Sequence, residues 1–298
     1  MAKTLGLDQQ SHEEILRKER KSNSAWSKLK RNKTALLGLF AVSFMIALAV
    51  LAPVITNGKP NEIHPIDAYL KFFEKGHLLG TDEFGRDLFT RICYGARVSL
   101  LVAAGATIIG GVTGVILGLI AGYMGGIVDA VLMRIMDGVL AFPFILLSIV
   151  LMTVLGSGVI NVILAIGIAE IPRFARVVRG QVLIVKKEEY CNAGRVIGIS
   201  HFRMLTHHIL PNTVSEVIVY GTLNIASAII SEAALSFLGL GIELPTASWG
   251  SILRSGRNCL NTAPHIAAVS GTFILITVIG FNLLGDGIRD VLDPKMKK

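Results

Sequence analysis

Charged side chains are scarce in this sequence, and their scarcity excludes an ordinary soluble domain. Only 17% of the 298 residues are charged and 52% are hydrophobic, with a mean hydropathy of +0.62. Soluble domains typically have about 25% charged residues. The net charge of +8 does not indicate nucleic-acid binding, because no polar stretch is long enough to fold into a basic face. The composition is typical of a protein with several membrane spans.

Cysteine is also rare, and the signatures of metal and phosphate chemistry are missing from the sequence. The three cysteines, Cys93, Cys191 and Cys259, are far apart, so they form neither a zinc spacing nor a disulfide framework. No histidine has a further ligand at the spacing of zinc sites, and there is no GxxxxGK[ST] phosphate loop. The sequence therefore predicts no catalytic residue, no metal site and no bound cofactor. If ATP drives this protein, another chain must bind the ATP.

Long uncharged runs predict an all-α protein with six membrane-spanning helices. A helix needs about 20 apolar residues to cross the hydrocarbon core, and residues 34–58 and 98–128 contain no charge at all. The predicted helices cover residues 35–55, 98–121, a stretch from about 127, then 159–174, 214–238 and 266–284. The second helix carries Gly110, Gly111, Gly114, Gly118 and Gly122, and small residues at this spacing predict close packing against another helix.

The distribution of basic residues predicts the orientation of these helices. Lysine and arginine are enriched before the first span, in the region 173–212 and in the C-terminal tail, and such clusters remain in the cytoplasm. We expect a multi-pass protein of the inner (cytoplasmic) membrane with both termini in the cytoplasm. The expected divisions are a cytoplasmic segment 1–34, a first helix 35–56, an outer loop 57–96, a permease domain 97–286 and a cytoplasmic tail 287–298.

Four ionisable residues inside the predicted spans are candidates for function, because such residues are rare at membrane depth. The sequence leaves two interpretations open for each of them: a structural ion pair or hydrogen bond, such as Arg134 with Asp137, or a place in a transport pathway. An ion-coupled transporter that uses Asp137 or Glu232 as a proton relay is one alternative function. The candidates are Asp129, Arg134, Asp137 and Glu232.

One long polar segment, KKEEYCNAGRVIGISHFRMLTHHILPN at residues 186–212, separates the fourth and fifth predicted helices. It resembles the EAA loop of permease subunits in ABC importers, with residues 192–194 on E-A-A, Gly198 as the glycine, and His208, Leu210 and Pro211 at its end. Asn192 stands where the family has an acidic residue, and Gly194 stands where it has alanine. Gly194 should weaken the first short helix by up to about 1 kcal/mol.

Six further blocks extend the resemblance over nearly the whole chain from Trp26 onward. They are RNKTALLGL, LLGTDEFGRDLFTRICYGARVSL, GYMGGIVDAVLMRIMDGVLAFPFILL, ARVVRGQVL, SEAALSFLGLGIELPTASWGSIL and FNLLGDGIRDVLDP. In this order they are similar to the second (C-type) permease of the dipeptide/oligopeptide/nickel ABC importer family. The resemblance implies the MetI-like fold of type I importers. It also implies a second homologous permease, two ATPase subunits that bind ATP and Mg, and an extracellular or periplasmic substrate-binding protein.

The resemblance further implies that residues 186–212 transmit motion from an ATPase; we call them the coupling segment. In this reading Gly198 is a hinge between two short helices, and Pro211 stops the second one before the fifth span. Peptide is the expected cargo, with a nickel chelate or glutathione as alternatives on the same scaffold. An intramembrane enzyme or a scaffold without transport would leave these blocks unexplained. The expected coupling residues are Glu188, Glu189, Asn192, Ala193, Gly194, Gly198, His208, Leu210 and Pro211.

Overall fold

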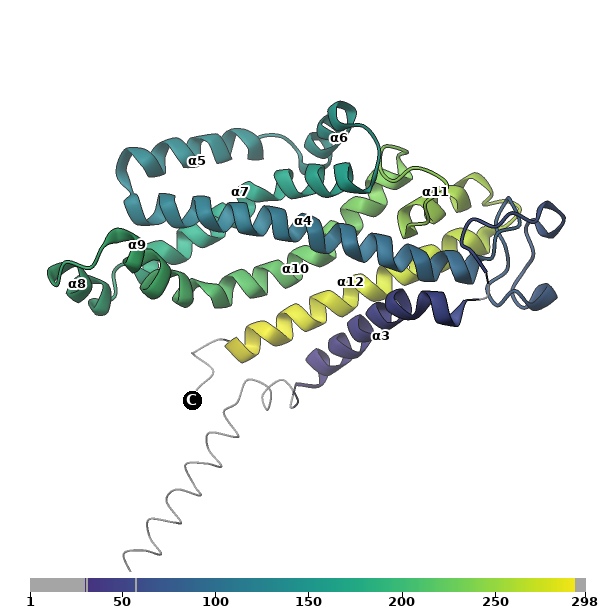
Figure 1. Cartoon of the computed structure of the whole chain (residues 1–298), viewed down its shortest axis with the longest axis horizontal. Helices are drawn as coiled ribbons and strands as arrows, with labels where there is room; N and C mark the ends of the chain where they lie inside the picture. The colour runs from purple at the N-terminus through teal and green to yellow at the C-terminus, as the bar shows by residue number, and fades with distance from the viewer. Residues whose placement is uncertain (1–29, 31, 57, 293–298) are drawn as a thin grey trace, which may run out of the picture.

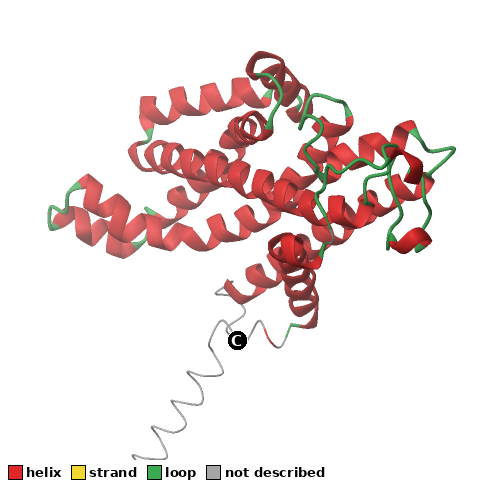
Figure 2. Cartoon of the chain, turned by 45° about the vertical axis from the view of Figure 1, so that its right-hand side comes forward, coloured by secondary structure: helices red, strands yellow, loops and turns green. Residues whose placement is uncertain are grey.

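A computed structural model describes residues 30, 32–56 and 58–292 of the chain. Within these residues the structure consists of helices and loops without a β-strand, as the sequence predicts. The helices form an elongated bundle, with the longest loops gathered at one end (Figures 1 and 2). Most of the predicted cytoplasmic N-terminal segment and the last six residues of the predicted tail lie outside the described residues.

Helices α3 (Lys33–Ile55) and α12 (Pro264–Leu292) lie side by side and antiparallel (Figure 1). Asn32 caps α3, because its side-chain oxygen accepts hydrogen bonds from the backbone N–H groups of Thr34 and Ala35, both at 3.1 Å. A Cβ atom placed on Gly38 would lie 2.6 Å from the backbone nitrogen of Leu284, so the two helices touch backbone to backbone. The first predicted span is confirmed, and the sixth is longer than expected.

Helix α4 (Leu88–Met124) packs along α7 (Val159–Val185) through its glycines. A Cβ atom on Gly114 would lie 2.4 Å from Cβ of Phe174, and one on Gly118 would lie 2.5 Å from the carbonyl oxygen of Ala175. The predicted close packing of the second span is therefore confirmed. Both helices exceed their predicted lengths. Since α7 continues about three turns past Phe174, Glu170 lies near the middle of this helix.

The third predicted span is not one straight helix. It is broken into α5 (Gly126–Leu140) and α6 (Phe144–Leu155), which are bent by 88° relative to each other. The break has a local cause: Pro143 has no backbone N–H, and its ring disfavours the helical conformation of the preceding Phe142. The predicted start near residue 127 is confirmed.

The fifth predicted span extends into the coupling segment. Helix α8 (Glu189–Val196) is followed by the short α9 (His201–Arg203), the π-helical turn η3 (Met204–Ile209) and α10 (Leu210–Phe237). The helical run from α9 to α10 is unbroken, so the prediction that Pro211 stops a helix is wrong. Pro211 lies in the first turn of α10, where a missing N–H costs little, and the wide π turn before it makes this placement possible.

The end of the bundle opposite α8 holds the turns η1 (Pro65–Asp67) and η2 (Glu74–Gly76) and the helix α11 (Trp249–Asn258) (Figure 1). Trp249 is fully buried, and its indole N–H donates to the carbonyl oxygen of Ile92 at 3.2 Å. A buried pair also fixes this end, with Nε of Arg86 2.6 Å from Oδ2 of Asp82. The loops at this end are therefore anchored in the core.

Four helical runs in the described chain are long and apolar enough to cross a membrane, or five if the bent pair α5 and α6 counts as one span. They are α3, α4, the run 201–237 and α12. Helix α7 has 27 residues, about 40 Å at 1.5 Å per residue, and so has the length of a span. However, α7 carries several charged side chains, so it is not apolar enough to be counted among these runs. The count of six spans therefore remains a prediction.

Candidate coupling segment and polar face

The coupling segment is attached to the end of α7 by a small hydrophobic core. Helix α8 and the turn η3 each bury one side against α7, while α8's other side remains exposed. This packing links the segment mechanically to α7, and η3 continues directly into α10. The buried residues are Val178, Val182 and Val185 of α7 with Cys191, Met204 and Ile209 of the segment.

Helix α8 ends in the turn that the sequence predicts at Gly198. Gly198 has a φ of +82°, which glycine adopts without strain. The N–H of Ile199 bonds to the carbonyl of Gly194 at 3.0 Å, and the N–H of Gly198 bonds to that of Arg195 at 3.1 Å. These two bonds form a Schellman motif, which ends a helix and reverses the chain. The predicted turn is confirmed, whereas its role in coupling is a separate question.

Gly194, the departure from the alanine of the family pattern, has a packing explanation. It is buried, and a Cβ atom placed on it would lie 2.6 Å from the terminal methyl group of Met204 and 3.2 Å from Cδ1 of Ile199. The missing methyl group lets the η3 turn lie directly on α8. Because a methionine side chain bends easily, an alanine here would shift Met204 rather than break the segment.

The tip of the coupling segment exposes three large apolar side chains that the sequence analysis did not select. Val196 is 89% exposed, Ile197 80% and Phe202 76%. They surround the Gly198 hinge at the extreme end of the bundle. Exposed apolar side chains at this position make the tip a candidate contact surface for a protein or a membrane. The signal was present in the sequence as the apolar residues on either side of Gly198.

The predicted coupling residues divide into an exposed and a partly buried group. Glu188, Glu189, Asn192 and Ala193 are exposed on or beside α8, and Pro211 is also exposed, whereas His208 and Leu210 are half-buried. Desolvation raises the pKa of the neighbouring Tyr190 hydroxyl above its usual value, so this group is neutral at physiological pH. The two exposed glutamates lie three and four residues before Asn192, which lacks the expected carboxylate.

The end of α4 is also tied to the coupling segment. The hydroxyl of Tyr123 lies 2.8 Å from Nδ1 of His201, and the two rings meet edge to face with centroids 5.6 Å apart. Nζ of Lys186 donates to the carbonyl oxygen of Gly122 at 2.7 Å. Movement of the segment would therefore be transmitted to α4 as well as to α7 and α10.

A second cluster of polar residues forms a ladder of ion pairs between α5 and α7. Arg179 binds both carboxylate oxygens of Asp129 at 2.6 Å, and Nη2 of Arg176 lies 2.7 Å from Oδ1 of Asp137. The predicted partner of Asp137, Arg134, is exposed and makes no ion pair in the described chain. In the sequence, the ladder is indicated by the two arginines of ARVVRGQVL, Arg176 and Arg179, because a spacing of three residues places both on one side of a helix.

The ladder continues on α7 itself, where Nη1 of Arg173 lies 2.9 Å from Oε1 of the buried Glu170. We call the side of the bundle that carries Asp137, Arg173 and Arg176 the polar face; their side chains are 50%, 42% and 56% exposed. A charge at the centre of a helix that faces lipid costs about 2.5–3.5 kcal/mol. The charges of Arg173 and Arg176 therefore favour a face that borders water or protein over one that borders lipid.

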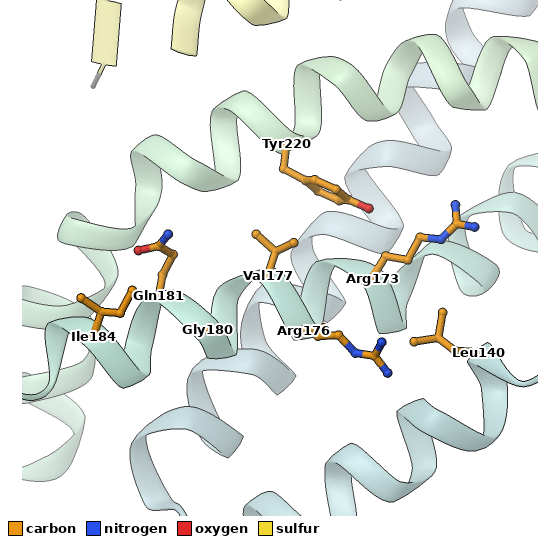
Figure 3. Close-up of a pocket in the computed structure, with 8 residues that line it drawn as sticks. All are labelled: Leu140, Arg173, Arg176, Val177, Gly180, Gln181, Ile184 and Tyr220. Carbon is orange, nitrogen blue, oxygen red and sulfur yellow. The ribbon is translucent and has the colours of Figure 1, made fainter. Parts of the chain in front are cut away.

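The polar face is hollowed by a cavity of about 650 Å³ (Figure 3). Most of its wall is α7, with Leu140 from α5 and Tyr220 from α10 completing it. Figure 3 shows the guanidinium group of Arg173 extending from α7 on the side of Tyr220 and that of Arg176 extending on the side of Leu140. The volume is that of a site for a small molecule.

Glu232, the fourth intramembrane candidate, lies away from this face. It is fully buried, and its carboxylate accepts hydrogen bonds from the hydroxyls of Ser99 and Ser236, both at 2.9 Å. Ser99 also accepts the backbone N–H of Trp249 at 3.2 Å. The structure thus places Glu232 in a cluster that joins α4, α10 and α11.

Comparison with known proteins identifies the class of protein to which this bundle belongs. The sequence profile of the binding-protein-dependent transport system inner membrane component matches residues 114–298. The profile of the N-terminal TM domain of oligopeptide transport permease C matches residues 22–71. These matches define a membrane-spanning permease of an ABC importer. The chain belongs to the binding-protein-dependent transport system inner membrane component family.

Two curated relatives match over almost the full chain. The dipeptide transport system permease protein DppC of Alkalihalophilus pseudofirmus is 43% identical over 277 residues, 92% of this chain and 90% of the relative. The glutathione transport system permease protein GsiD of Escherichia coli is 43% identical over 272 residues, 91% of this chain and 90% of the relative. The predicted resemblance to peptide permeases is confirmed, and membership in this family rules out the ion-coupled transporter and the enzyme.

A solved structure supports the fold. An inward-facing form of the MetNI methionine ABC transporter contains a chain with a TM-score of 0.57 and 19% identity, covering 69% of this chain and 97% of that chain. At this identity the likeness shows the fold alone, which is the predicted MetI-like fold. As a member of this family the chain is a translocation subunit without catalytic activity of its own, and it works in general with ATPase and substrate-binding partners.

Proposed function

We propose that this chain is one of two homologous permeases of a peptide-importing ABC transporter, with residues 186–212 seated in a groove of one ATPase subunit. The exposed apolar tip of the coupling segment, Val196, Ile197 and Phe202, supports this assignment most directly. Two ATPase subunits would bind ATP and Mg beneath the permeases, and a binding protein would deliver the peptide to the outer end. Both chain termini would lie in the cytoplasm, with the domain divisions predicted from the sequence.

The proposed mechanism follows from the attachments of the coupling segment. ATP-driven closure of the ATPases would move α8 and η3 together, because Cys191, Met204 and Ile209 pack on one core with α7. The unbroken run into α10 and the Tyr123–His201 contact would carry this movement to α10 and α4. The helices that bear the polar face would then tilt and switch the side from which the pathway is open.

The docking assignment is tested with Phe202→Asp, alone and combined with Ile197→Asp. A charge in the centre of an apolar interface should weaken ATPase retention by the purified permease pair about tenfold or more. The matched control is Ile66→Asp, because Ile66 is 91% exposed at the opposite end of the bundle. Equal ATPase retention by the tip variants and the control would refute the docking assignment.

The hinge is tested separately with Gly198→Pro. Proline fixes φ near −65° and cannot adopt the φ of +82° at this position, so the two parts of the segment should lose their relative orientation. We expect loss of substrate-stimulated ATP hydrolysis and of uptake in proteoliposomes. Gly198→Asn is the control, since asparagine tolerates this conformation and should retain most activity. Normal uptake by Gly198→Pro, or by Ala193→Asp, would show that the segment does not couple the two processes.

The peptide assignment rests on the cargo named for the two relatives and is tested on the substrate itself. The complex is purified with its binding protein, and the ligand that co-purifies is identified by mass spectrometry. A dipeptide or oligopeptide is the expected result, and glutathione would support the alternative cargo. A nickel chelate in its place would keep the transport mechanism and replace the cargo.

A further inference from the structure

The cavity in the polar face has the chemistry of an anion site. Its wall carries Arg173 and Arg176, together with the hydroxyl of Tyr220 and the amide of Gln181. No carboxylate lines the cavity, although Glu170 and Asp137 hold the two arginines from the side. The polar groups of the wall are therefore mainly hydrogen-bond donors, and two of them are guanidinium groups, each paired on one edge with a carboxylate.

Hydrogen bonds within the protein do not occupy all of these donors. A guanidinium has five N–H groups, and the two ion pairs occupy Nη1 of Arg173 and Nη2 of Arg176. The other edge of each guanidinium remains available for a bidentate contact. In the described chain neither Gln181 nor the Tyr220 hydroxyl has a hydrogen-bond partner. Tyr220 is held in place instead by an edge-to-face contact with Phe174, with ring centroids 4.7 Å apart.

We propose that this cavity receives the free carboxylate of the transported peptide, with Arg176, Arg173 and the Tyr220 hydroxyl as its donors. The planar fork of an arginine matches a carboxylate, and the paired acids orient each fork while leaving half of it open. The cavity volume of about 650 Å³ leaves room for the adjoining residues of a short peptide. The inference rests on the proposed function, because it assigns a substrate contact to the pathway of a peptide permease.

The test compares a dipeptide with a free C-terminus and the same dipeptide with a C-terminal amide. ATP-dependent uptake is measured in proteoliposomes that contain the complete transporter and its binding protein. Because the binding protein is the same throughout, its own preference cancels when the acid-to-amide uptake ratio of a variant is divided by that of the wild type. We expect Arg176→Gln to lower the ratio about tenfold and Tyr220→Phe about threefold.

Two features of the design separate the cavity from general effects. Arg134→Gln removes the same charge from the exposed side of α5, outside the cavity, and should leave the ratio unchanged. Tyr220→Phe removes one oxygen and keeps the ring on Phe174, so it reports on the site even if Arg176→Gln assembles poorly. Arg173→Gln is avoided in the first round, because it would leave the buried Glu170 without its partner.

Each outcome decides for or against the proposal. An unchanged ratio in Tyr220→Phe and Arg176→Gln, with uptake intact, would overturn the carboxylate site while keeping the peptide permease. Absence of ATP-driven uptake of any peptide by the wild type would overturn the proposed function itself. If the site binds a lipid phosphate instead, omission of anionic lipid from the vesicles will change acid and amide uptake equally, and the variants will keep the wild-type ratio.

Discussion

Two exposed surfaces of this bundle differ completely in chemistry. On α3 the outward side chains are large and apolar: Phe40 is 71% exposed, Val50 67% and Val54 79%. On the polar face the outward side chains are Arg173, Arg176 and Asp137. Each surface includes one helix long enough to reach through a bilayer, α3 for the first and α7 for the second. Side chains that are exposed in the isolated chain therefore have two different expected surroundings. Those of α3 suit contact with lipid, whereas those of α5 and α7 suit contact with water in a pathway or with a partner chain.

The helices that carry the two surfaces also pack against different parts of the bundle. Helix α3 makes its closest packing with α12, so it forms an outer layer of the bundle (Figure 1). Helix α7 is held at close range by the glycines of α4 and by the hydrophobic core beneath the coupling segment. Motion of the coupling segment would thus reach the polar face directly, while α3 would remain an anchor in the membrane.

The largest expected effect comes from placing a charge on each surface. Phe44→Arg puts an arginine at the centre of α3 and should destabilise the protein by about 3 kcal/mol, because the charge meets hydrocarbon. Gly180→Arg puts the same residue on the polar face, where nothing lies within 4 Å of the added Cβ, and should cost little. Thermal unfolding in lipid nanodiscs measures both, and equal losses would contradict the assignment of α3 to lipid.

A smaller effect is expected when the packing of α4 against α7, behind the polar face, is disturbed. Gly114→Val forces a side chain against Phe174 and the backbone of α7, which should destabilise the protein by about 2 kcal/mol and displace the arginines of α7. Gly138→Val adds the same side chain where nothing lies within 4 Å and serves as the control. A melting temperature for Gly114→Val equal to that of the control would show that α4 does not fix α7.

The smallest expected effect concerns a single rung of the ladder. Arg179→Gln and Asp129→Asn should each cost about 1 kcal/mol, because each removes a charged partner from a bidentate pair. The double variant should cost less than the sum of the two, measured by the same unfolding assay. Arg134→Gln removes an arginine without an ion pair in the described chain and should change stability by less than about 0.5 kcal/mol. Additive losses would mean that this pair does not join α5 to α7.

Local patterns in the sequence were sufficient for several elements. The uncharged run before Gly58 gave the first span, because length and hydropathy alone decide whether a helix can cross a membrane. The glycine spacing of the second span predicted its close contact, and Gly198 predicted the hinge, because both depend on the missing side chain of glycine itself. The family blocks identified the permease, since each is a string of residues that needs no three-dimensional information.

Tertiary structure decided what the sequence left open. Asp137 has Arg134 three residues away along its own helix, yet it pairs with Arg176, because the antiparallel packing of α5 on α7 brings that arginine closer. The π turn before Pro211 lets α10 continue through a proline that looked like a stop. The cavity beside Tyr220 exists only where three helices meet. Sequence determines which helices form and what each can tolerate, whereas contacts between helices depend on packing over distances that no local pattern encodes.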